Sequence, residues 1–335
     1  MASVTDFSSD PQLDGIDPDD EAGFPGGGAR PCSDETATLG EGPRWDAERG
    51  ELLWVDIPAG TVHRSRVGSD GDLITIRGYI VGHPVGAAHP AAAGGWLLCA
   101  GEGFWHLDED GGLSQLAQPE ADRGGATRMN DARTDPRGRL FAGSMAYDQT
   151  PGAGRLHRLD VDGSVTTVLD GLTISNGIDW SGDGATVYLA DSGPGTVDRF
   201  DYDVDSGTFS GRRTIYRSPE DGVVPDGLVV DTDDTVWVAF HGGGVVRRLS
   251  PEGEVLAEVR LPAMLATAPC FGGPELSTLF VTTATEGLGE EELAAQPGAG
   301  RVLRLDGTGA TGRPVVPYAG PVPSTAPAPR RRFGA

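Results

Sequence analysis

Four polar residues occur at matching places along the chain. They are Glu41 before Gly-Pro, Asn130 before Asp-Ala, Asn176 before Gly-Ile and Asp226 before Gly-Leu. Carboxylate and amide oxygens are ligands that hard cations such as Ca²⁺, Mg²⁺ and Mn²⁺ prefer, and with water completing the shell they also suit Zn²⁺. Because Asn-Gly and Asp-Gly pairs are also common turn formers, the pattern alone leaves open both a metal site and a set of ordinary turns.

The segment 174–203 shows most clearly which elements would position these residues. It predicts a short strand at 177–180, a Ser-Gly-Asp-Gly turn, a strand at 186–190, a Gly-Pro-Gly turn and an alternating strand at 197–202. Similar copies begin near residues 42, 85, 130, 226 and 270. These starts lie about 44 to 50 residues apart, which is typical of one four-stranded propeller blade.

We therefore predict an all-β, six-bladed β-propeller with four antiparallel strands per blade around a central channel. The innermost strands line that channel, so polar residues at the starts of separate blades should converge. The composition agrees, because 52 Gly and 25 Pro among 335 residues are typical of a turn-rich chain. We expect the propeller at 36–320, a disordered acidic leader at 1–35 and a flexible Pro/Arg-rich tail at 321–335.

Composition also excludes several functions. The chain has no lysine, which rules out Schiff-base chemistry and a P-loop. The formal net charge of −24 argues against nucleic acid as a partner. No segment has the pattern of a signal peptide or a membrane span. Cys32, Cys99 and Cys270 are odd in number and widely spaced, so we expect reduced thiols in a cytoplasmic protein.

The six histidines are scattered and form no zinc-binding pattern. Three lie within strand-like segments, where we expect structural roles: His63, His106 and His157. The other three lie near the starts or ends of blades, where they could face the channel: His83, His89 and His241.

The motifs themselves are more specific than their spacing. They are LGEGPRW at 39–45, LWVDI at 53–57, RMNDA at 128–132 with FAGSM at 141–145, ISNGIDW at 174–180 with DRFDYD at 198–203, PDGL at 225–228 and CFGG at 270–273. Together they resemble the gluconolactonase/regucalcin family, also called the senescence marker protein family. The resemblance extends over about residues 38–320, through all six blades in order.

Members of that family are six-bladed propellers with one divalent metal near the top of the channel, and many hydrolyse sugar lactones. The resemblance implies three metal ligands, Glu41, Asn176 and Asp226. Asp226 would also be the general acid/base, taking a proton from metal-activated water and returning it to the leaving ring oxygen. Arg128 and Asn130 would bind the substrate.

One loop departs from the family pattern. Animal members carry a glutamate after the Phe-Ala-Gly-Ser/Thr-Met motif, whereas this chain continues as Ala-Tyr-Asp-Gln-Thr at 146–150. Asp148 is therefore a shorter candidate for the sugar contact made there.

Three functions stay open at this stage. The first is a metal-dependent lactonase of carbohydrate metabolism that opens a sugar lactone. The second is a metal hydrolase of the same fold that acts on a non-sugar lactone or an organophosphate ester. The third is a non-enzymatic propeller that binds a metal or another ligand. We expect a small-molecule partner, and a monomer or weak homo-oligomer.

Overall fold

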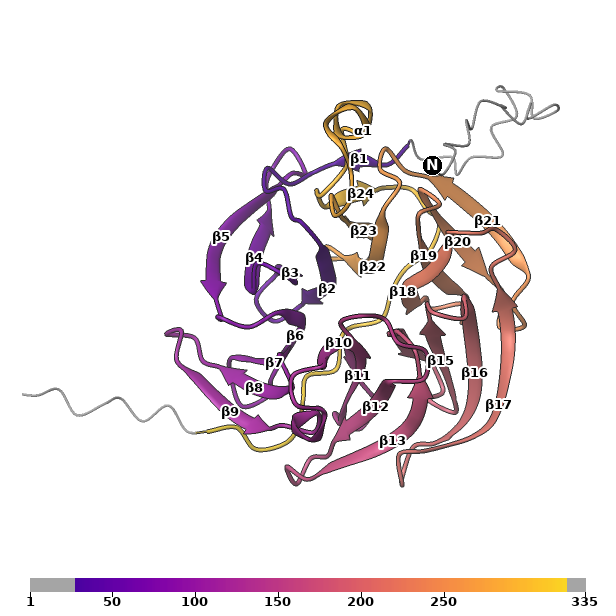
Figure 1. The fold of residues 1–335 in the computed structure, drawn as a ribbon. Helices are drawn as coiled ribbons and strands as arrows, with labels where there is room; N and C mark the ends of the chain where they lie inside the picture. Colours follow the sequence, from indigo (N-terminus) through magenta and orange to yellow (C-terminus); the bar gives the residue numbers. More distant parts are fainter. Residues whose placement is uncertain (1–27, 324–335) are drawn as a thin grey trace, which may run out of the picture.

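Six four-stranded antiparallel sheets form a ring around a central axis (Figure 1). The structure, a computed structural model, describes residues 28–323. It confirms the prediction of an all-β six-bladed propeller with four antiparallel strands in each blade. Most of the expected leader and tail, at 1–27 and 324–335, lies outside the described residues.

Five blades use four consecutive strands, and the first strand of each contacts the first strand of the next blade around the channel. In chain order these strands are β2 (Gly40–Asp46), β3 (Glu51–Asp56), β4 (Thr61–Val67) and β5 (Leu73–Ile80); β6 (Val85–Pro90), β7 (Trp96–Ala100), β8 (Gly103–Leu107) and β9 (Leu113–Ala117); β10 (Thr127–Thr134), β11 (Leu140–Ala146), β12 (Gly154–Leu159) and β13 (Val165–Leu172); β14 (Ser175–Trp180), β15 (Thr186–Asp191), β16 (Thr196–Asp203) and β17 (Thr208–Arg217); and β18 (Val224–Val230), β19 (Val236–His241), β20 (Val245–Leu249) and β21 (Val255–Arg260).

The sixth blade is closed by the other end of the chain. Its strands are β22 (Ala266–Gly272), β23 (Thr278–Thr283), β24 (Leu303–Leu305) and the two-residue β1 (Arg30–Pro31). Arg30 and Pro31 were predicted to lie in a disordered leader. The structure instead pairs them with β24 at the outer edge of the sheet. Two short helices lie between strands, a 3₁₀ turn at Ala121–Arg123 and α1 at Glu290–Ala295.

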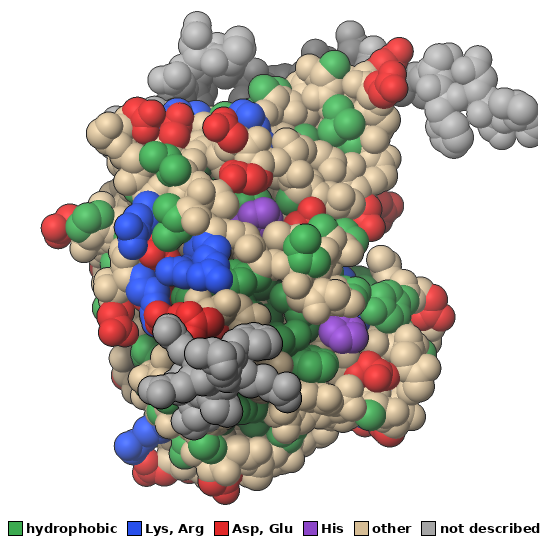
Figure 2. Space-filling view, turned by 90° about the vertical axis from the view of Figure 1, so that its left-hand side faces the viewer, with side chains coloured by type: hydrophobic (Ala, Val, Ile, Leu, Met, Phe, Trp, Pro, Cys, Tyr) green, Lys and Arg blue, Asp and Glu red, His purple; other side chains and the backbone are tan. Residues whose placement is uncertain are grey.

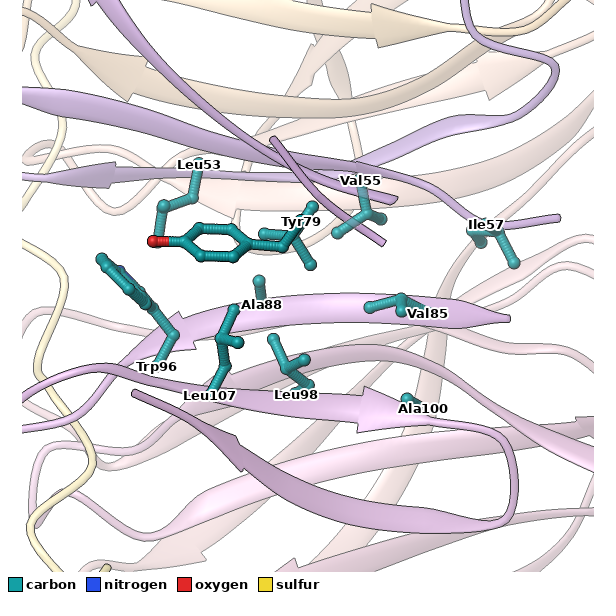
Figure 3. Close-up of a cluster of buried hydrophobic side chains, with 11 residues drawn as sticks. Leu53, Val55, Ile57, Tyr79, Val85, Ala88, Trp96, Leu98, Ala100 and Leu107 are labelled. Carbon is teal, nitrogen blue, oxygen red and sulfur yellow. The ribbon is translucent and has the colours of Figure 1, made fainter. Parts of the chain in front are cut away.

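Hydrophobic clusters hold the ring together at each interface between neighbouring blades. Figure 3 shows the cluster between the first two blades, where Leu53 and Val55 of β3 lie opposite Trp96 and Leu98 of β7. All four side chains are essentially inaccessible to solvent. Because burying one such side chain stabilises a fold by about 1.5 to 3 kcal/mol, packing between blades fixes how the inner strands sit around the channel.

The inner strands are irregular where the candidate site residues lie. Strand pairing shifts at Asn176 and Gly177 in β14, at Asp226 and Gly227 in β18, and at Asn130 in β10. Irregularities of this kind bend a strand and re-aim its side chains. The Asn-Gly and Asp-Gly pairs therefore lie inside strands, and the alternative that they only form turns is wrong.

The two glycines allow neighbouring inner strands to approach closely. A Cβ atom on Gly177 would lie 2.2 Å from the backbone nitrogen of Leu228 in the next blade. A Cβ atom on Gly227 would lie 2.3 Å from Cβ of Ala268 in the blade after that. Glycine is required here for close backbone approach, which also brings the residues before each glycine close together.

A C-terminal strap, residues 310–320, crosses the propeller at the far ends of the inner strands, where Figure 1 shows it running behind the channel. Backbone hydrogen bonds attach it to four blades: Gly312 N to Leu276 O, Thr232 N to Thr311 O, Ala319 N to Gly138 O and Tyr318 N to Pro90 O. The buried side chain of Tyr318 completes the cluster between the second and third blades. These contacts make the strap part of the propeller.

Acidic and basic side chains are intermixed on the face shown in Figure 2. On the first blade, Arg64 and Arg66 both pair with the buried carboxylate of Glu51. None of the helices within residues 28–323 has the length and apolar character that crossing a membrane requires.

Candidate metal and catalytic site

The starts of the inner strands bring the four polar residues together in the channel. Glu41 lies on β2, Asn130 on β10, Asn176 on β14 and Asp226 on β18, with exposed fractions of 4 to 6%. Asn130 Nδ2 donates a 3.0 Å hydrogen bond to Asn176 Oδ1. The Glu41 carboxyl group lies close enough to Asp226 to add to the rise in its pKa that burial causes. The assignment of these residues to metal or substrate stays a prediction.

The two carboxyl groups are held in a place that disfavours their charge. Burial raises the pKa of Glu41 to about 8, and repulsion from Asp131 adds to the shift. Burial also raises the pKa of Asp226 well above its ordinary value, and Glu41 and Asp131 contribute further repulsion. Asp226 Oδ1 is buried with no hydrogen-bond partner among residues 28–323. The Arg128 guanidinium acts against both pKa shifts, and Arg44 acts against that of Glu41, but burial outweighs them.

A divalent cation fits this arrangement. Glu41 and Asp226 offer anionic oxygens, and Asn176 offers a neutral amide oxygen. The described part of the chain contains no group of three His, Cys, Asp or Glu side chains placed to hold a metal. The ligand shell would therefore combine carboxylate, amide and water oxygens, which suits Ca²⁺ or Mg²⁺ better than a soft metal.

Ser192, which the sequence analysis missed, fixes the orientation of the Asn176 amide. Its hydroxyl donates to Pro225 O at 2.7 Å, so its oxygen accepts the 2.9 Å hydrogen bond from Asn176 Nδ2. The amide nitrogen is thereby held on Ser192, and Oδ1 is left on the side of Asn130. The only signal in the sequence was the place of Ser192, directly after the strand that pairs with β14.

Two aspartates position the segments that lead into the site. Asp56 Oδ atoms accept hydrogen bonds from Thr38 N and Leu39 N, just before Glu41. Asp191 does the same for the two residues just before β14, Thr173 and Ile174. Each aspartate follows its site residue by 15 positions, so the repeat itself could have indicated this shared role.

Arg128 reaches the same place from β10 and is 9% exposed. Its Nη1 donates to Asn130 Oδ1 at 2.6 Å and to Met129 O at 3.1 Å. Burial lowers its pKa, while the nearby Tyr147, Glu41 and other acidic groups act in the opposite direction. Its Nε and Nη2 have no hydrogen-bond partner in the described structure, so they are available to an oxygen of a ligand.

Asn130 makes more contacts to the protein than the sequence suggested. Its Nδ2 donates to Ser175 O at 2.9 Å as well as to Asn176 Oδ1, and its Oδ1 accepts from Arg128. Both amide hydrogens are thus used within the protein. In this arrangement Asn130 links Arg128 to Asn176, and only the second lone pair of its oxygen remains for a substrate.

Asp148 lies apart from this network. Its carboxylate accepts hydrogen bonds from the backbone and hydroxyl of Thr150, which lower its pKa, and it is exposed. Across residues 28–323 no hydrogen bond or ion pair joins it to the four channel residues. Its neighbour Tyr147, by contrast, lies close enough to Arg128 to influence that arginine's pKa. The predicted sugar contact of Asp148 thus gains no support from this conformation.

One of the three histidines proposed to face the channel lies beside the site. His241 ends β19 and pairs with Val224 at the start of β18, and burial lowers its pKa. His89 is instead at the far end of the channel, where Nε2 lies 2.8 Å from Thr134 Oγ1 and 3.1 Å from Val316 O. His83 is exposed and stacks on Trp105.

The histidines expected to be structural do have partners inside the protein. His63 stacks on Trp54, with ring centroids 4.0 Å apart. His106 Nε2 lies 3.0 Å from Gly94 O, and His157 Nε2 lies 2.6 Å from the buried carboxylate of Glu120.

A buried ion pair lies next to the site in the channel. Arg44, which is 1% exposed, reaches from β2 to Asp131 Oδ1 on β10 at 2.7 Å and also donates to Ala132 O. It lies three residues beyond Glu41 along the strand. Both charged residues occur within the LGEGPRW and RMNDA motifs, but nothing in the sequence indicated that they pair.

This fold and this centre define a class of protein: a six-bladed propeller with a small, oxygen-rich, acidic centre where its inner strands begin. The family model for the SMP-30/Gluconolactonase/LRE-like region matches residues 39–285. The chain therefore belongs to that family, as the motifs indicated.

Individual relatives agree with this assignment. Regucalcin from Sus scrofa is 39% identical over 293 residues, which cover 85% of this chain and 96% of the porcine protein. A crystal structure of a calcium-binding protein, regucalcin, from Agrobacterium tumefaciens is 29% identical, with a TM-score of 0.80 over 88% of this chain and 98% of that one. A luciferin-regenerating enzyme is 30% identical, with a TM-score of 0.77 over 84% of this chain and 95% of that one.

Proposed function

We propose that this chain is a divalent-metal-dependent lactonase that opens a sugar lactone to the corresponding hydroxy acid. The observation that supports it most is the buried Glu41 and Asp226 pair, with Asp226 Oδ1 left without a partner and Arg128 beside it. Membership of a family whose description includes gluconolactonase supports the reaction class.

Glu41, Asn176 and Asp226 would hold the cation. When bound, it would polarise the lactone carbonyl and lower the pKa of a water molecule. Ca²⁺ is the first candidate, because the candidate ligands are all oxygens and because the relative from Agrobacterium tumefaciens is named as calcium-binding. Mg²⁺, Mn²⁺ and Zn²⁺ belong in the same test.

Asp226 would transfer the proton. Its Oδ1 has no hydrogen-bond partner in the described structure, so this oxygen can accept a proton from the attacking water. As the bond from the carbonyl carbon to the ring oxygen breaks, the same group would return the proton to that oxygen. No other carboxylate near the site has a free oxygen of this kind, within residues 28–323, that is also buried.

Arg128 would position the substrate. Its Nε and Nη2 can donate to sugar hydroxyls, or to the carboxylate that forms as the ring opens. Asn130 holds the guanidinium in place through its 2.6 Å contact. We give Asp148 no binding role, because it would first have to release both hydrogen bonds to Thr150.

A pH-stat assay tests the proposal. It should compare aldonolactones with non-sugar lactones and an organophosphate ester, using protein stripped of metal and then supplied with each cation. We expect acid release from aldonolactones, its loss on chelation and its return with cation. Preference for the other substrates would identify a different hydrolase of this fold. Metal binding without turnover of any substrate would indicate a binding protein.

A further inference from the structure

A second polar cavity lies at the opposite end of the channel, beneath the C-terminal strap. It has a volume of about 170 Å³ and lies between the far ends of β10, β14 and β18 and strap residues 313–316. The Arg44 and Asp131 ion pair occupies the inner strands between this cavity and the candidate catalytic site. Two arginines and one tryptophan line the cavity: Arg133, Arg313 and Trp180.

Arg133 is held in a fixed position, but one nitrogen of its guanidinium makes no hydrogen bond within the described chain. The side chain is 8% exposed, and its Nε pairs with Asp179 Oδ1 at 2.7 Å. Asp179 is held in turn by Val230 N and Trp180 N, so three blades set the position of the arginine. Its buried Nη1 has no hydrogen-bond partner within residues 28–323. A buried cationic donor without a hydrogen-bond partner destabilises the folded protein unless a ligand or water accepts its hydrogen bond.

Arg313 approaches from the strap. Its Nη2 pairs with Asp234 at 2.7 Å, and its buried Nη1 likewise has no partner in the described chain. The guanidinium lies against Gly182, where an added Cβ atom would come within 2.5 Å of Nη2 and 2.8 Å of Cζ. Glycine at 182 is therefore what leaves room for the arginine.

The buried side-chain atoms that lack a partner in the described lining of this cavity are all donors. Trp180 contributes a third, because its buried indole Nε1 has no partner in the described structure. The two carboxylates in the lining are already used. Asp135 accepts from Arg139, from Tyr202 and from backbone N–H groups, and Asp179 is paired as described above. Surplus donors beside satisfied carboxylates suit an anion rather than a cation.

We propose that this cavity binds a small oxyanion, a phosphate, sulfate or carboxylate group, between Arg133 and Arg313. Guanidinium groups bind such oxygens through short, charge-assisted hydrogen bonds. The net charge of −24 repels anions from the surface as a whole, so binding depends on these buried donors. The site is independent of the metal and lactonase assignments.

Isothermal titration of the full-length protein with inorganic phosphate, sulfate and acetate tests the proposal. We expect saturable binding of at least one anion. Comparison of phosphate and sulfate with acetate shows whether the cavity prefers a tetrahedral or a carboxylate group. Arg313→Gln and Gly182→Ala should each weaken that binding at least about tenfold. The glycine variant keeps every charge and only displaces the Arg313 guanidinium.

Arg213→Gln is the matched control, because Arg213 is exposed on β17 and makes no ion pair with any described residue. It should leave anion binding unchanged. Arg133→Gln is a second test if circular dichroism shows that it folds. The proposal is wrong if none of the anions binds, or if Arg213→Gln weakens binding as much as Arg313→Gln does.

Discussion

Asp226 is the residue at which a ligand role and a proton-transfer role can be separated by mutation. Asp226→Asn keeps the size and one carbonyl oxygen but removes the carboxylate. If the carboxylate is the base, kcat should fall by about 10² to 10⁴ even at saturating metal. Asn176→Ala, which removes only an amide ligand, should recover part of its activity as the metal concentration rises. Near wild-type turnover of Asp226→Asn in excess metal would leave Asp226 as a ligand only.

The pKa of Glu41 predicts how the metal-free protein responds to pH. A carboxyl group with a pKa of about 8 in the fold, against an ordinary value of 4.5, binds its proton more tightly in the folded state. Its contribution to stability is therefore complete below about pH 4.5 and is lost as the pH rises through 8. In EDTA, the melting temperature should fall across this window.

Glu41→Gln is the control for this pH dependence, because it removes the titrating group and should flatten that part of the profile. Saturating Ca²⁺ should flatten it as well, since bound cation favours the ionised form. If the melting temperature in EDTA depends on pH in the same way for wild type and Glu41→Gln, Glu41 does not titrate in this range.

Ser192 allows a test of how the metal ligand is oriented. Ser192→Ala removes the acceptor for Asn176 Nδ2, so the amide can rotate and present nitrogen in place of oxygen. Groups that orient metal ligands typically change metal affinity by 10- to 100-fold, and here we expect a loss of about 10-fold by titration calorimetry. Turnover should recover at high metal concentration, unlike that of Asp226→Asn. An unchanged affinity would mean that Asn176 is not a ligand or is held by other contacts.

The sequence predicted which residues converge in the channel better than it predicted the contacts that hold them. The convergence of Glu41, Asn176 and Asp226 could be predicted because the repeat places them at equivalent points on the inner strands, and their assignment as ligands stays a prediction. The pairing of Arg44 with Asp131 could not be predicted, since it joins two blades that are not neighbours and depends on side-chain reach. The sequence also did not indicate that Asp148 accepts hydrogen bonds from Thr150, which compete with the predicted sugar contact.

At the scale of the strand, Gly177 sets the distance between two halves of the site. The Cβ atom of Gly177→Ala would lie 2.2 Å from Leu228 N, so β14 and β18 must move apart. We expect destabilisation of about 1 to 3 kcal/mol, the usual cost of overpacking, and a loss of metal affinity as Asn176 and Asp226 separate. Thermal denaturation and metal titration measure both.

Gly78→Ala is the control for this substitution. Gly78 is exposed on β5, and an added Cβ atom there would meet nothing nearer than Val62 O at 4.0 Å. It should change neither stability nor metal binding appreciably. If Gly177→Ala behaves like Gly78→Ala, the inner strands are not held as closely as the structure indicates.

At the scale of the whole molecule, the last blade includes a segment that was predicted to belong to the leader. A two-residue strand containing proline has no periodic pattern, so β1 could not be recognised from the sequence. The contacts of β1 link two blades. It pairs with β24 of the sixth blade, and Leu73 N of the first blade donates to Cys32 O just after it. The segment thus joins the last blade to the first.

Two truncations show whether this closure stabilises the propeller. Removal of residues 1–27 leaves β1 and its contacts intact, whereas removal of residues 1–34 also deletes β1, Cys32 and Ser33. The longer truncation breaks the hydrogen bonds of Cys32 and Ser33 to Val302 and removes a buried thiol from the cluster between the sixth and first blades. Its melting temperature should therefore be lower than that of the shorter truncation by several degrees.

The proposed lactonase activity, measured for the two truncations, distinguishes closure from a direct role in the site. No site residue lies before Glu41, so the longer truncation should retain its kcat at temperatures where it is still folded and lose activity earlier on heating. Equal melting temperatures would show that β1 does not close the ring. If the longer truncation is folded but inactive at low temperature, the segment contributes to catalysis, because closure alone would change only the stability.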